Sequence, residues 1–362
     1  MSEGTQVSTL VESMTQDTAA DGHAANVIVL RNSQGMTATF MDIGATWLSC
    51  RLPVKGGDRE VLLGVSNIKD FYAQQSYMGT TVGRYANRIA RGQFEIDGVH
   101  FQASTNQAGN TLHGGTEGFD KRRWDIVEKT EQAVVFCLES PDGDQGFPGN
   151  LRVSVRYELS EENQISIDYF AKTDKSTIVN LTNHAYFNLL GADDGFDCLG
   201  HTVTVNSQQY LPTNEVGIPQ GALHSVVGTS FDLTEPKAIG DQLLTDPQQS
   251  AAKGYDHSFL LSEQCKQGAC AAKVSTPDGS VTLQVFSSKP AMQLYTGNWL
   301  AGTPNRTKGS YQDYAGLALE TQFLPDSPNH PEWRQESCIL TPDQEYAYTT
   351  CYQFEFSGDS SN

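Results

Sequence analysis

The sequence predicts an all-β fold, built as one large antiparallel β-sandwich. Short runs of β-branched and aromatic residues alternate with turn signals along most of the chain, which is the pattern of adjacent antiparallel strands. Helical periodicity is scarce, and strands do not alternate with long amphipathic helices as they do in a parallel α/β sheet. All-β architectures often run well past the usual domain size as one unit, so the length of 362 residues does not decide the number of domains. We expect a single domain over residues 26–358, preceded by a polar segment, residues 1–25, of unknown role.

The clearest hairpin surrounds Asp97-Gly98, a dipeptide that tolerates the positive φ angles of a two-residue turn. Its strands are expected at residues 92–96 and 99–103. The best helix candidate is short and covers residues 67–75. Three further strand pairs are expected at residues 124–130 with 133–139, 151–159 with 164–172, and 271–275 with 281–286.

The chain is strongly acidic, with 43 Asp and Glu against 24 Lys and Arg and a net charge of −19. This charge repels nucleic acids and anionic membrane surfaces. No Gly-rich phosphate-binding run is present. We therefore expect a neutral small molecule as the partner, with neither nucleic acid nor membrane, and the chain as a monomer or a homodimer.

The seven cysteines are odd in number and scattered, and none has C-x-x-C spacing. This distribution disfavours a disulfide framework and a zinc site. The segment 1–25 has neither the basic start nor the apolar middle of a secretory signal. These features predict a cytoplasmic location.

Four polar stretches interrupt the strand pattern and lie among apolar residues, at 83–89, 110–115, 183–188 and 319–326. In a sheet protein such residues are either satisfied structural groups or a functional site. His184 is expected on or beside a buried strand, where its imidazole can donate a proton to a bound oxygen. A core histidine bonded to the backbone is the alternative.

Glu320 follows the apolar run of residues 317–319. A carboxylate there loses solvent and gains proton affinity, as a general base near neutral pH requires; a buried ion pair with Arg88 is the alternative. His113 precedes two glycines, so the backbone can turn sharply and present the imidazole to a pocket. A turn histidine without a role is the alternative there.

Further donors and aromatic residues lie near these stretches. Asp256 and His257 open an apparent strand and either orient ligand hydroxyls at a pocket rim or cap a turn. A donor cluster suited to hydroxyl groups, or a surface salt-bridge cluster, consists of Arg84, Asn87 and Arg88. Apolar pocket walls, or simply core, are expected from Trp124, Tyr186, Phe187, Tyr295, Trp299 and Phe323.

Taken together, five motifs resemble the galactose mutarotase (aldose 1-epimerase) family, in the family's order and over about residues 27–356. The motifs are G-R-Y-A-N-R-I-A-R-G from Gly83, N-T-L-H-G-G from Asn110 with G-F-D-K-R-R-W from Gly118, N-L-T-N-H-A-Y-F-N-L from Asn180, Q-L-Y-T-G-N from Gln293, and L-E-T-Q-F-L-P-D-S-P-N-H-P from Leu319. The resemblance implies the family's large antiparallel β-sandwich, the galactose mutarotase-like supersandwich. It also implies an enzyme that interconverts the α and β anomers of a free aldohexose, galactose or glucose, without metal or organic cofactor.

Residue by residue, the resemblance implies that Glu320 is the general base and His184 the general acid. Glu320 takes the proton of the anomeric hydroxyl while a protonated His184 gives one to the ring oxygen, and the reverse transfers reclose the ring on the other face. The residues implied to bind the sugar are Asn87, Arg88, His113, Asp256 and Gln293.

Four other functions remain open from the sequence. A hexose-6-phosphate 1-epimerase needs Lys or Arg side chains that converge on the phosphate. An inverting glycoside hydrolase would use Glu320 and Asp256 as carboxylates about 6.5–9.5 Å apart. A sugar-binding protein of the same fold without catalysis does not need both proton carriers. A metal site built from His113, His184 and His257 has spacings that match no usual ligand motif.

Overall fold

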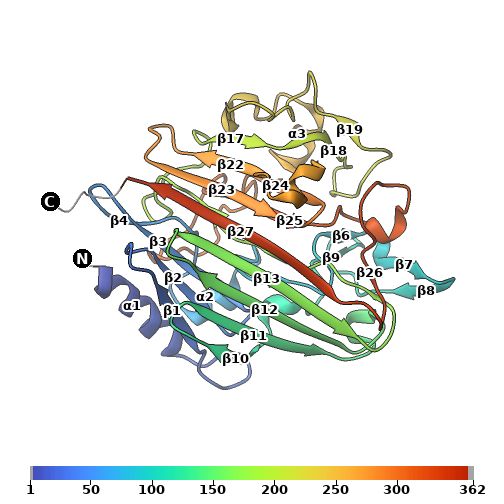
Figure 1. Ribbon diagram of the computed structural model, residues 1–362, viewed down its shortest axis with the longest axis horizontal. Helices are drawn as coiled ribbons and strands as arrows, with labels where there is room; N and C mark the ends of the chain where they lie inside the picture. Colours follow the sequence, from blue (N-terminus) through green and yellow to red (C-terminus); the bar gives the residue numbers. More distant parts are fainter. Residues whose placement is uncertain (1–2, 358–362) are drawn as a thin grey trace.

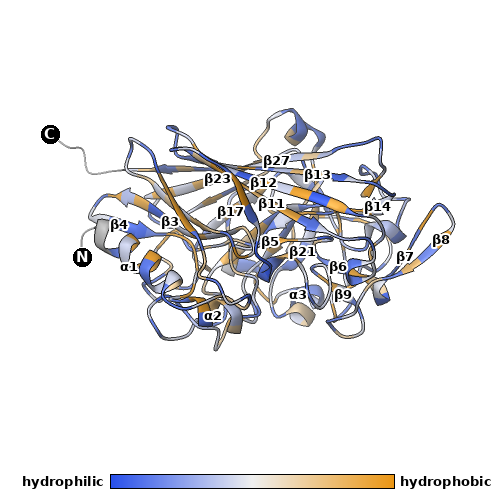
Figure 2. Ribbon diagram, turned by 90° about the horizontal axis from the view of Figure 1, so that it is seen from below, coloured by the Kyte–Doolittle hydropathy of each residue, from blue (hydrophilic) through white to orange (hydrophobic). Residues whose placement is uncertain are grey.

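The computed structural model describes residues 3–357. Antiparallel strands in two large layers make up most of the molecule (Figures 1 and 2). In the view of Figure 2, a nine-stranded sheet spans the upper side, and the other sheets lie beneath it. The hydrophobic core fills the space between the layers. The predicted all-β sandwich is therefore confirmed.

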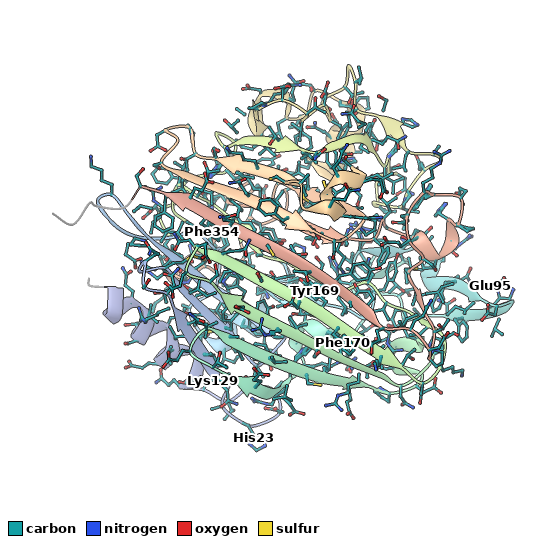
Figure 3. All side chains as sticks on the ribbon, in the orientation of Figure 1. His23, Glu95, Lys129, Tyr169, Phe170 and Phe354 are labelled. Atoms are coloured by element: carbon teal, nitrogen blue, oxygen red, sulfur yellow. The ribbon has the colours of Figure 1, made fainter. Side chains whose placement is uncertain are left out.

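The nine-stranded sheet is antiparallel throughout, and its strands follow one another in the order β10-β11-β12-β13-β27-β23-β22-β17-β20. Side chains alternate between its two faces, so Tyr169 is buried while its neighbour Phe170 is 36% exposed (Figure 3). The strands are β10 (Asp125–Lys129), β11 (Ala133–Ser140), β12 (Leu151–Leu159), β13 (Gln164–Thr173), β27 (Tyr346–Phe356), β23 (Val281–Ser287), β22 (Ala272–Ser275), β17 (Thr202–Val205) and β20 (Lys237–Ala238).

The second layer contains a four-stranded sheet and a six-stranded sheet. The first consists, in order, of β1 (Val27–Arg31), β2 (Thr37–Met41), β3 (Thr46–Val54) and β4 (Gly57–Glu60). The second consists, in order, of β16 (Tyr186–Phe187), β25 (Leu317–Gln322), β24 (Ala291–Tyr295), β21 (Asp256–Leu261), β18 (Ser207–Tyr210) and β19 (His224–Ser225). Every residue of β25 is buried, so both faces of this strand are covered.

Four short strand pairs complete the sheets: β14 (Thr177–Ile178) with β26 (Ile339–Leu340), β15 (Thr182–Asn183) with β5 (Thr81–Val82), β6 (Arg88–Ile89) with β9 (Thr111–Leu112), and β7 (Gln93–Ile96) with β8 (Val99–Gln102). The β7–β8 pair is the predicted Asp97-Gly98 hairpin. It carries Glu95 and projects from the body of the molecule (Figure 3). The three other predicted strand pairs are also confirmed, as β10–β11, β12–β13 and β22–β23.

Three α-helices occur among the described residues: α1 (Glu3–Thr15), α2 (Ile68–Ala73) and α3 (Pro247–Ala252). The prediction of a short helix near residue 67 is confirmed, because the Asn67 side chain caps α2 by accepting the backbone N–H of Asp70. The sequence analysis did not predict α1. Its buried residues Leu10 and Met14 pack with Phe71 of α2. Their four-residue spacing is the helical signal that the polar composition of this segment conceals.

All seven cysteines are free, which confirms the expectation that the chain has no disulfide framework. Within residues 3–357, no helix is long and apolar enough to cross a membrane. The proposed limits of the domain, residues 26–358, remain a prediction, and their last residue lies outside the described part of the chain.

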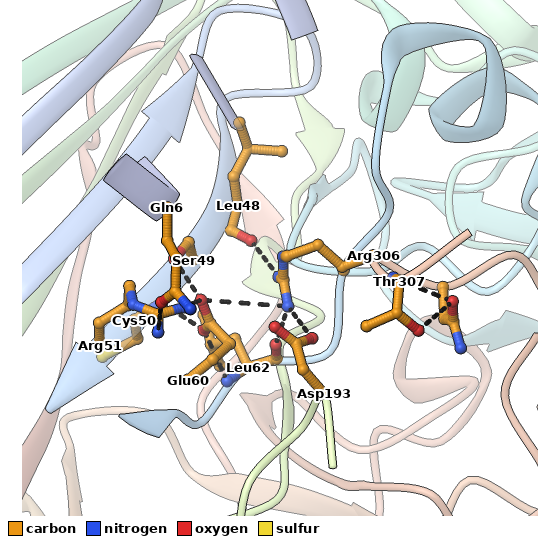
Figure 4. A network of polar contacts seen from close by, with 12 residues as sticks. Gln6, Leu48, Ser49, Cys50, Arg51, Glu60, Leu62, Asp193, Arg306 and Thr307 are labelled. Carbon is orange, nitrogen blue, oxygen red and sulfur yellow. Dashed lines mark hydrogen bonds and ion pairs between the residues drawn. The ribbon is translucent and has the colours of Figure 1, made fainter. Parts of the chain in front are cut away.

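A buried network of charges joins β3 and the edge strand β4 to the loop that contains Arg306 (Figure 4). The Arg306 guanidinium lies 2.7 Å from the Asp193 carboxylate and 4.0 Å from that of Glu60, and it donates to the backbone oxygen of Leu48 at 2.9 Å. Arg51 connects the same network to α1, because its guanidinium donates to the Gln6 side chain. Segments distant in sequence are therefore held together by few side chains.

We expect Arg306→Met to lower the free energy of unfolding by about 3–5 kcal/mol, because the buried Glu60 and the half-buried Asp193 would lose the Arg306 guanidinium. Urea unfolding followed by tryptophan fluorescence measures the change. Lys172→Met is the matched control, since it breaks an ion pair with Glu345 in which the lysine is 59% exposed, and should cost less than about 1 kcal/mol. Equal losses in the two variants would contradict a structural role for the network.

Candidate active site

A cavity of about 370 Å³ opens on one face of the six-stranded sheet. This volume lies within the range typical of sites for small molecules. Its wall contains polar groups from the sheet, from the segments around β6 and β9, and from the loop at residues 213–217. Six of the seven predicted site residues line it: Asn87, Arg88, His113, His184, Asp256 and Glu320.

The register of three strands places the site on the sheet. Ser258 on β21, Gln293 on β24 and Glu320 on β25 lie directly opposite one another. Because side chains alternate along a strand, residues two positions away share their face, which adds Asp256 and Tyr295. The intervening leucines on β24 and β25 belong to the core on the other face. Each of these two strands therefore contributes side chains to the core on one face and to the pocket on the other.

His184 and Glu320 meet in the cavity. His184 follows β15, and its backbone N–H donates to the carbonyl oxygen of Thr80 at 2.9 Å. Its Nε2 atom lies 3.4 Å from Glu320 Oε1, and the two residues are only 4% and 2% exposed. Glu320 Oε2 and His184 Nδ1 have no hydrogen-bond partner within residues 3–357. Such unpartnered buried groups are expected where a ligand supplies the partner.

Burial changes the proton affinities of this pair in opposite directions. Loss of solvent raises the pKa of Glu320 well above its usual value, and the nearby Asp256 charge raises it further. The same loss of solvent lowers the pKa of His184 to about 4. Burial therefore disfavours the imidazolium form that the expected role of His184 as general acid requires. A proton shared by the pair is favoured by burial on Glu320.

His113 lies beside this pair in a strained turn. Its φ angle is 51°, and the two glycines that follow also have positive φ. The β6–β9 pairing brings it next to Asn87, whose backbone N–H donates to His113 Nδ1 at 3.1 Å. Burial lowers the pKa of His113 well below its usual value. The neutral imidazole therefore accepts at Nδ1 and carries its proton on Nε2, where it can donate to a ligand.

A metal ion fits this cluster poorly. One ligand atom from each of His113, His184 and Glu320 lies within 4.8 Å of the others, close enough for one ion. However, the bond at His113 Nδ1 places the proton on Nε2, so that nitrogen offers no lone pair to a cation. His257, the third member of the metal site considered from the sequence, is not part of the cluster.

Arg88, Asp256 and Gln293 form a chain of polar contacts. The Arg88 guanidinium lies 3.8 Å from the Asp256 carboxylate. Gln293 Nε2 donates to Asp256 Oδ1 at 2.6 Å, and the Gln293 amide oxygen accepts from the hydroxyl of Ser258. Gln293 is 2% exposed and does not line the cavity. Its amide N–H therefore fixes the orientation of the Asp256 carboxylate.

Several other candidates lie outside the pocket. Arg84 is buried and donates to the backbone oxygen of Pro148 and to Ser140, so it is a structural residue. His257 faces the core, where its ring packs against Phe231 at 4.6 Å between centroids, because it alternates with Asp256 on β21. Of the proposed aromatic walls, Tyr186, Tyr295 and Trp299 line the cavity, whereas Trp124, Phe187 and Phe323 belong to the core.

Several polar residues of the wall were not predicted from the sequence, among them Tyr77 and Gln107. Gln107 Oε1 accepts from the Arg88 guanidinium at 3.3 Å. Neither residue lies within the polar stretches that interrupt the strand pattern. Nothing in the local sequence distinguishes them from ordinary turn residues, since tertiary contacts alone bring them to the cavity.

Known proteins similar to this chain share most of its length. Residues 26–353 match the family model described as aldose 1-epimerase. The chain is 48% identical to the aldose 1-epimerase of Escherichia coli (strain K12) over 93% of its own length and 97% of that protein. It is 49% identical to the aldose 1-epimerase of Haemophilus influenzae, covering 93% and 98%. The crystal structure of galactose 1-epimerase from Lactobacillus acidophilus superposes with a TM-score of 0.81 at 31% identity, covering 94% and 97% of the two chains.

Proposed function

Because this chain belongs to the aldose 1-epimerase family and is an aldose 1-epimerase, we propose that the buried pair Glu320 and His184 carries its proton transfers. The observation that supports this assignment is their geometry. The two groups face each other at 3.4 Å in the cavity, each with an unpartnered polar atom. That distance exceeds a normal hydrogen bond, so both groups are free to turn to a ligand between or beside them.

In the proposed reaction, Glu320 removes the proton of the anomeric hydroxyl while His184 gives its proton to the ring oxygen. The bond between the anomeric carbon and the ring oxygen breaks, and the anomeric carbon becomes the carbonyl carbon of an aldehyde. Rotation about the adjacent carbon–carbon bond exposes the other face of the carbonyl, and the reverse transfers reclose the ring. The pair holds one proton throughout, which moves from His184 to Glu320 and back.

The electrostatics of the pocket support this cycle. Burial favours the arrangement in which Glu320 carries the proton and His184 is neutral. This is the arrangement that the pair adopts while the ring is open, so the pocket stabilises the enzyme in the middle of the reaction. The bound sugar must favour the charged arrangement that starts the cycle, through hydrogen bonds to its hydroxyl groups.

We further propose that Asn87, Arg88, His113 and Asp256 bind the hydroxyl groups of a free aldohexose, galactose or glucose. Arg88 and the Nε2–H of His113 supply donors, and the Asp256 carboxylate supplies an acceptor. We propose that Gln293 also binds the sugar, and its amide in addition holds the Asp256 carboxylate in place.

The charges of the cavity wall favour a neutral substrate over a hexose 6-phosphate. The described residues that line it include three carboxylates, Glu215, Asp256 and Glu320, and one guanidinium, that of Arg88. The guanidinium is itself close to Asp256. A phosphate would therefore meet more negative than positive charge.

The domain limits, the cellular compartment and the oligomeric state are also proposals. We assign catalysis to residues 26–358 as one domain and treat residues 1–25 as an addition to it. The free cysteines support a reducing compartment such as the cytoplasm. A monomer or a homodimer remains the expected form.

We expect Glu320→Gln and His184→Ala each to reduce turnover by roughly 10²–10⁴-fold, because each removes one proton carrier. Polarimetry of freshly dissolved α-galactose and α-glucose, in a weakly catalysing buffer, measures the approach to the anomeric equilibrium. Glu95→Gln and His100→Ala are matched controls on the exposed β7–β8 hairpin and should leave turnover unchanged. Near-wild-type turnover in either site variant, with a normal circular dichroism spectrum, would contradict the assignment of that residue as a proton carrier.

The pH profile of kcat/KM should show a broad plateau across neutral pH. At low pH the pair takes up a second proton and activity is lost. The lowered pKa of His184 places this loss of activity near pH 4 instead of near 6.5. At high pH the pair loses its only proton, and the raised pKa of Glu320 delays that loss well beyond the range of an ordinary carboxyl group. Activity that falls between pH 7 and 6, while the fold persists, would contradict this ordering.

A further inference from the structure

One part of the pocket wall comes from the turn after α2, residues 74–80, which contains none of the motifs described above. Tyr77 in this turn lines the cavity. The centroid of its ring lies 4.5 Å from that of His113, in an edge-on contact, and 6.0 Å from that of His184, with the two planes 19° apart. Tyr77 therefore contacts both imidazoles of the pocket.

The backbone holds Tyr77 in an uncommon conformation. Its φ angle is 56°, in the left-handed region that bulky residues seldom occupy. Both the backbone N–H and the hydroxyl of Thr80 donate to the carbonyl oxygen of Tyr77, at 3.0 and 2.9 Å. A non-glycine residue in this region is strained, and such residues cluster at functional sites.

The same turn forms hydrogen bonds with the backbone of His184. The backbone N–H of Gly79 donates to the carbonyl oxygen of His184 at 2.9 Å. In return, the backbone N–H of His184 donates to the carbonyl oxygen of Thr80 at 2.9 Å. The ring of Tyr77 and the imidazole of His184 are thus positioned by one piece of backbone structure. A change in the turn would move both.

The Tyr77 hydroxyl is available to a ligand. Within the part of the chain that the structure describes, no side chain or backbone group forms a hydrogen bond with it. Burial and the nearby Asp120 charge raise the pKa of Tyr77, so the hydroxyl keeps its proton and remains a donor. Tyr77 also lines a neighbouring cavity of about 700 Å³, and so lies at the boundary between the two spaces.

We propose that Tyr77 is a further substrate-binding residue of this enzyme, whose hydroxyl donates to an oxygen of the sugar and whose ring fixes the imidazoles of His113 and His184. This inference rests on the proposed function, because it takes the pocket to be the sugar site. The two parts of the side chain have separable tasks: the hydroxyl binds, and the ring positions the imidazoles and excludes water from them.

Tyr77→Phe tests the hydroxyl, because it keeps the ring. We expect KM for galactose, and Kd by isothermal titration calorimetry, to rise about 3- to 10-fold while kcat stays within about 2-fold, as for the loss of one hydrogen bond. Tyr72→Phe is the matched control, since Tyr72 lines only the neighbouring cavity. Unchanged binding in Tyr77→Phe, or an equal loss in Tyr72→Phe, would overturn the role of the hydroxyl.

Tyr77→Leu tests the ring, because it removes the aromatic ring and so lets water reach the imidazoles. Water favours the charged forms of His184 and Glu320, so the acid limb of the pH profile should move up and the alkaline limb down. We expect a narrower plateau and a kcat roughly 10-fold lower. A purely structural role would lower stability without narrowing the plateau, and this outcome would overturn the role of the ring. If Tyr77→Leu fails to fold, Tyr77→Phe still decides the inference.

The calorimetric measurement separates this inference from the proposed catalytic pair. If Glu320→Gln and His184→Ala keep their turnover while Tyr77→Phe binds galactose weakly, the catalytic assignment fails and Tyr77 remains a binding residue. If the two catalytic variants are inactive and Tyr77→Phe binds like wild type, the catalytic assignment stands and this inference fails.

Discussion

The exclusion of water from Glu320 and His184 is the constraint on which the rest of the site depends. A carboxyl group and an imidazole in water would divide their protons in the ordinary way, with the carboxylate charged and the imidazole titrating near neutral pH. Burial reverses this order and makes the uncharged arrangement the favourable one. The sandwich provides that burial because β25 is covered on both faces. The same packing that stabilises the fold therefore sets the chemistry of the pair.

Much of the fold and of the site was predictable because both follow from local patterns. Alternation and turn residues identified the hairpins. Polar residues among apolar ones made His184 and Glu320 candidates, and the family resemblance implied their roles. The protonation state of His184 was not predictable, because desolvation depends on the atoms that surround the ring. The positions of Gln293 and His257 required the register of β21 and β24, which decides the face of each side chain. Tyr77 and Gln107 reach the cavity through tertiary contacts that no local pattern records.

The N-terminal helix shows a different limit of sequence analysis. Its polar composition gave no prediction of a helix there, although Leu10 and Met14 follow helical spacing. Few apolar residues suffice here because α2 and the edge of the sandwich supply the other half of the contact. A short amphipathic helix is stabilised chiefly by such tertiary packing and only weakly by its own propensity. Amino-acid composition alone therefore does not predict that this helix forms.

The double burial of β25 also limits how this part of the chain can evolve. Since adjacent residues face opposite sides, insertion or deletion of one residue within the strand would turn Glu320 into the core and bring Leu319 into the pocket. Substitutions that respect the face of each position are tolerable, but a change of length is not. The loop at residues 213–217, at the wall of the cavity, has no such restriction. The loops are therefore free to diverge, while the strand that bears Glu320 keeps its length.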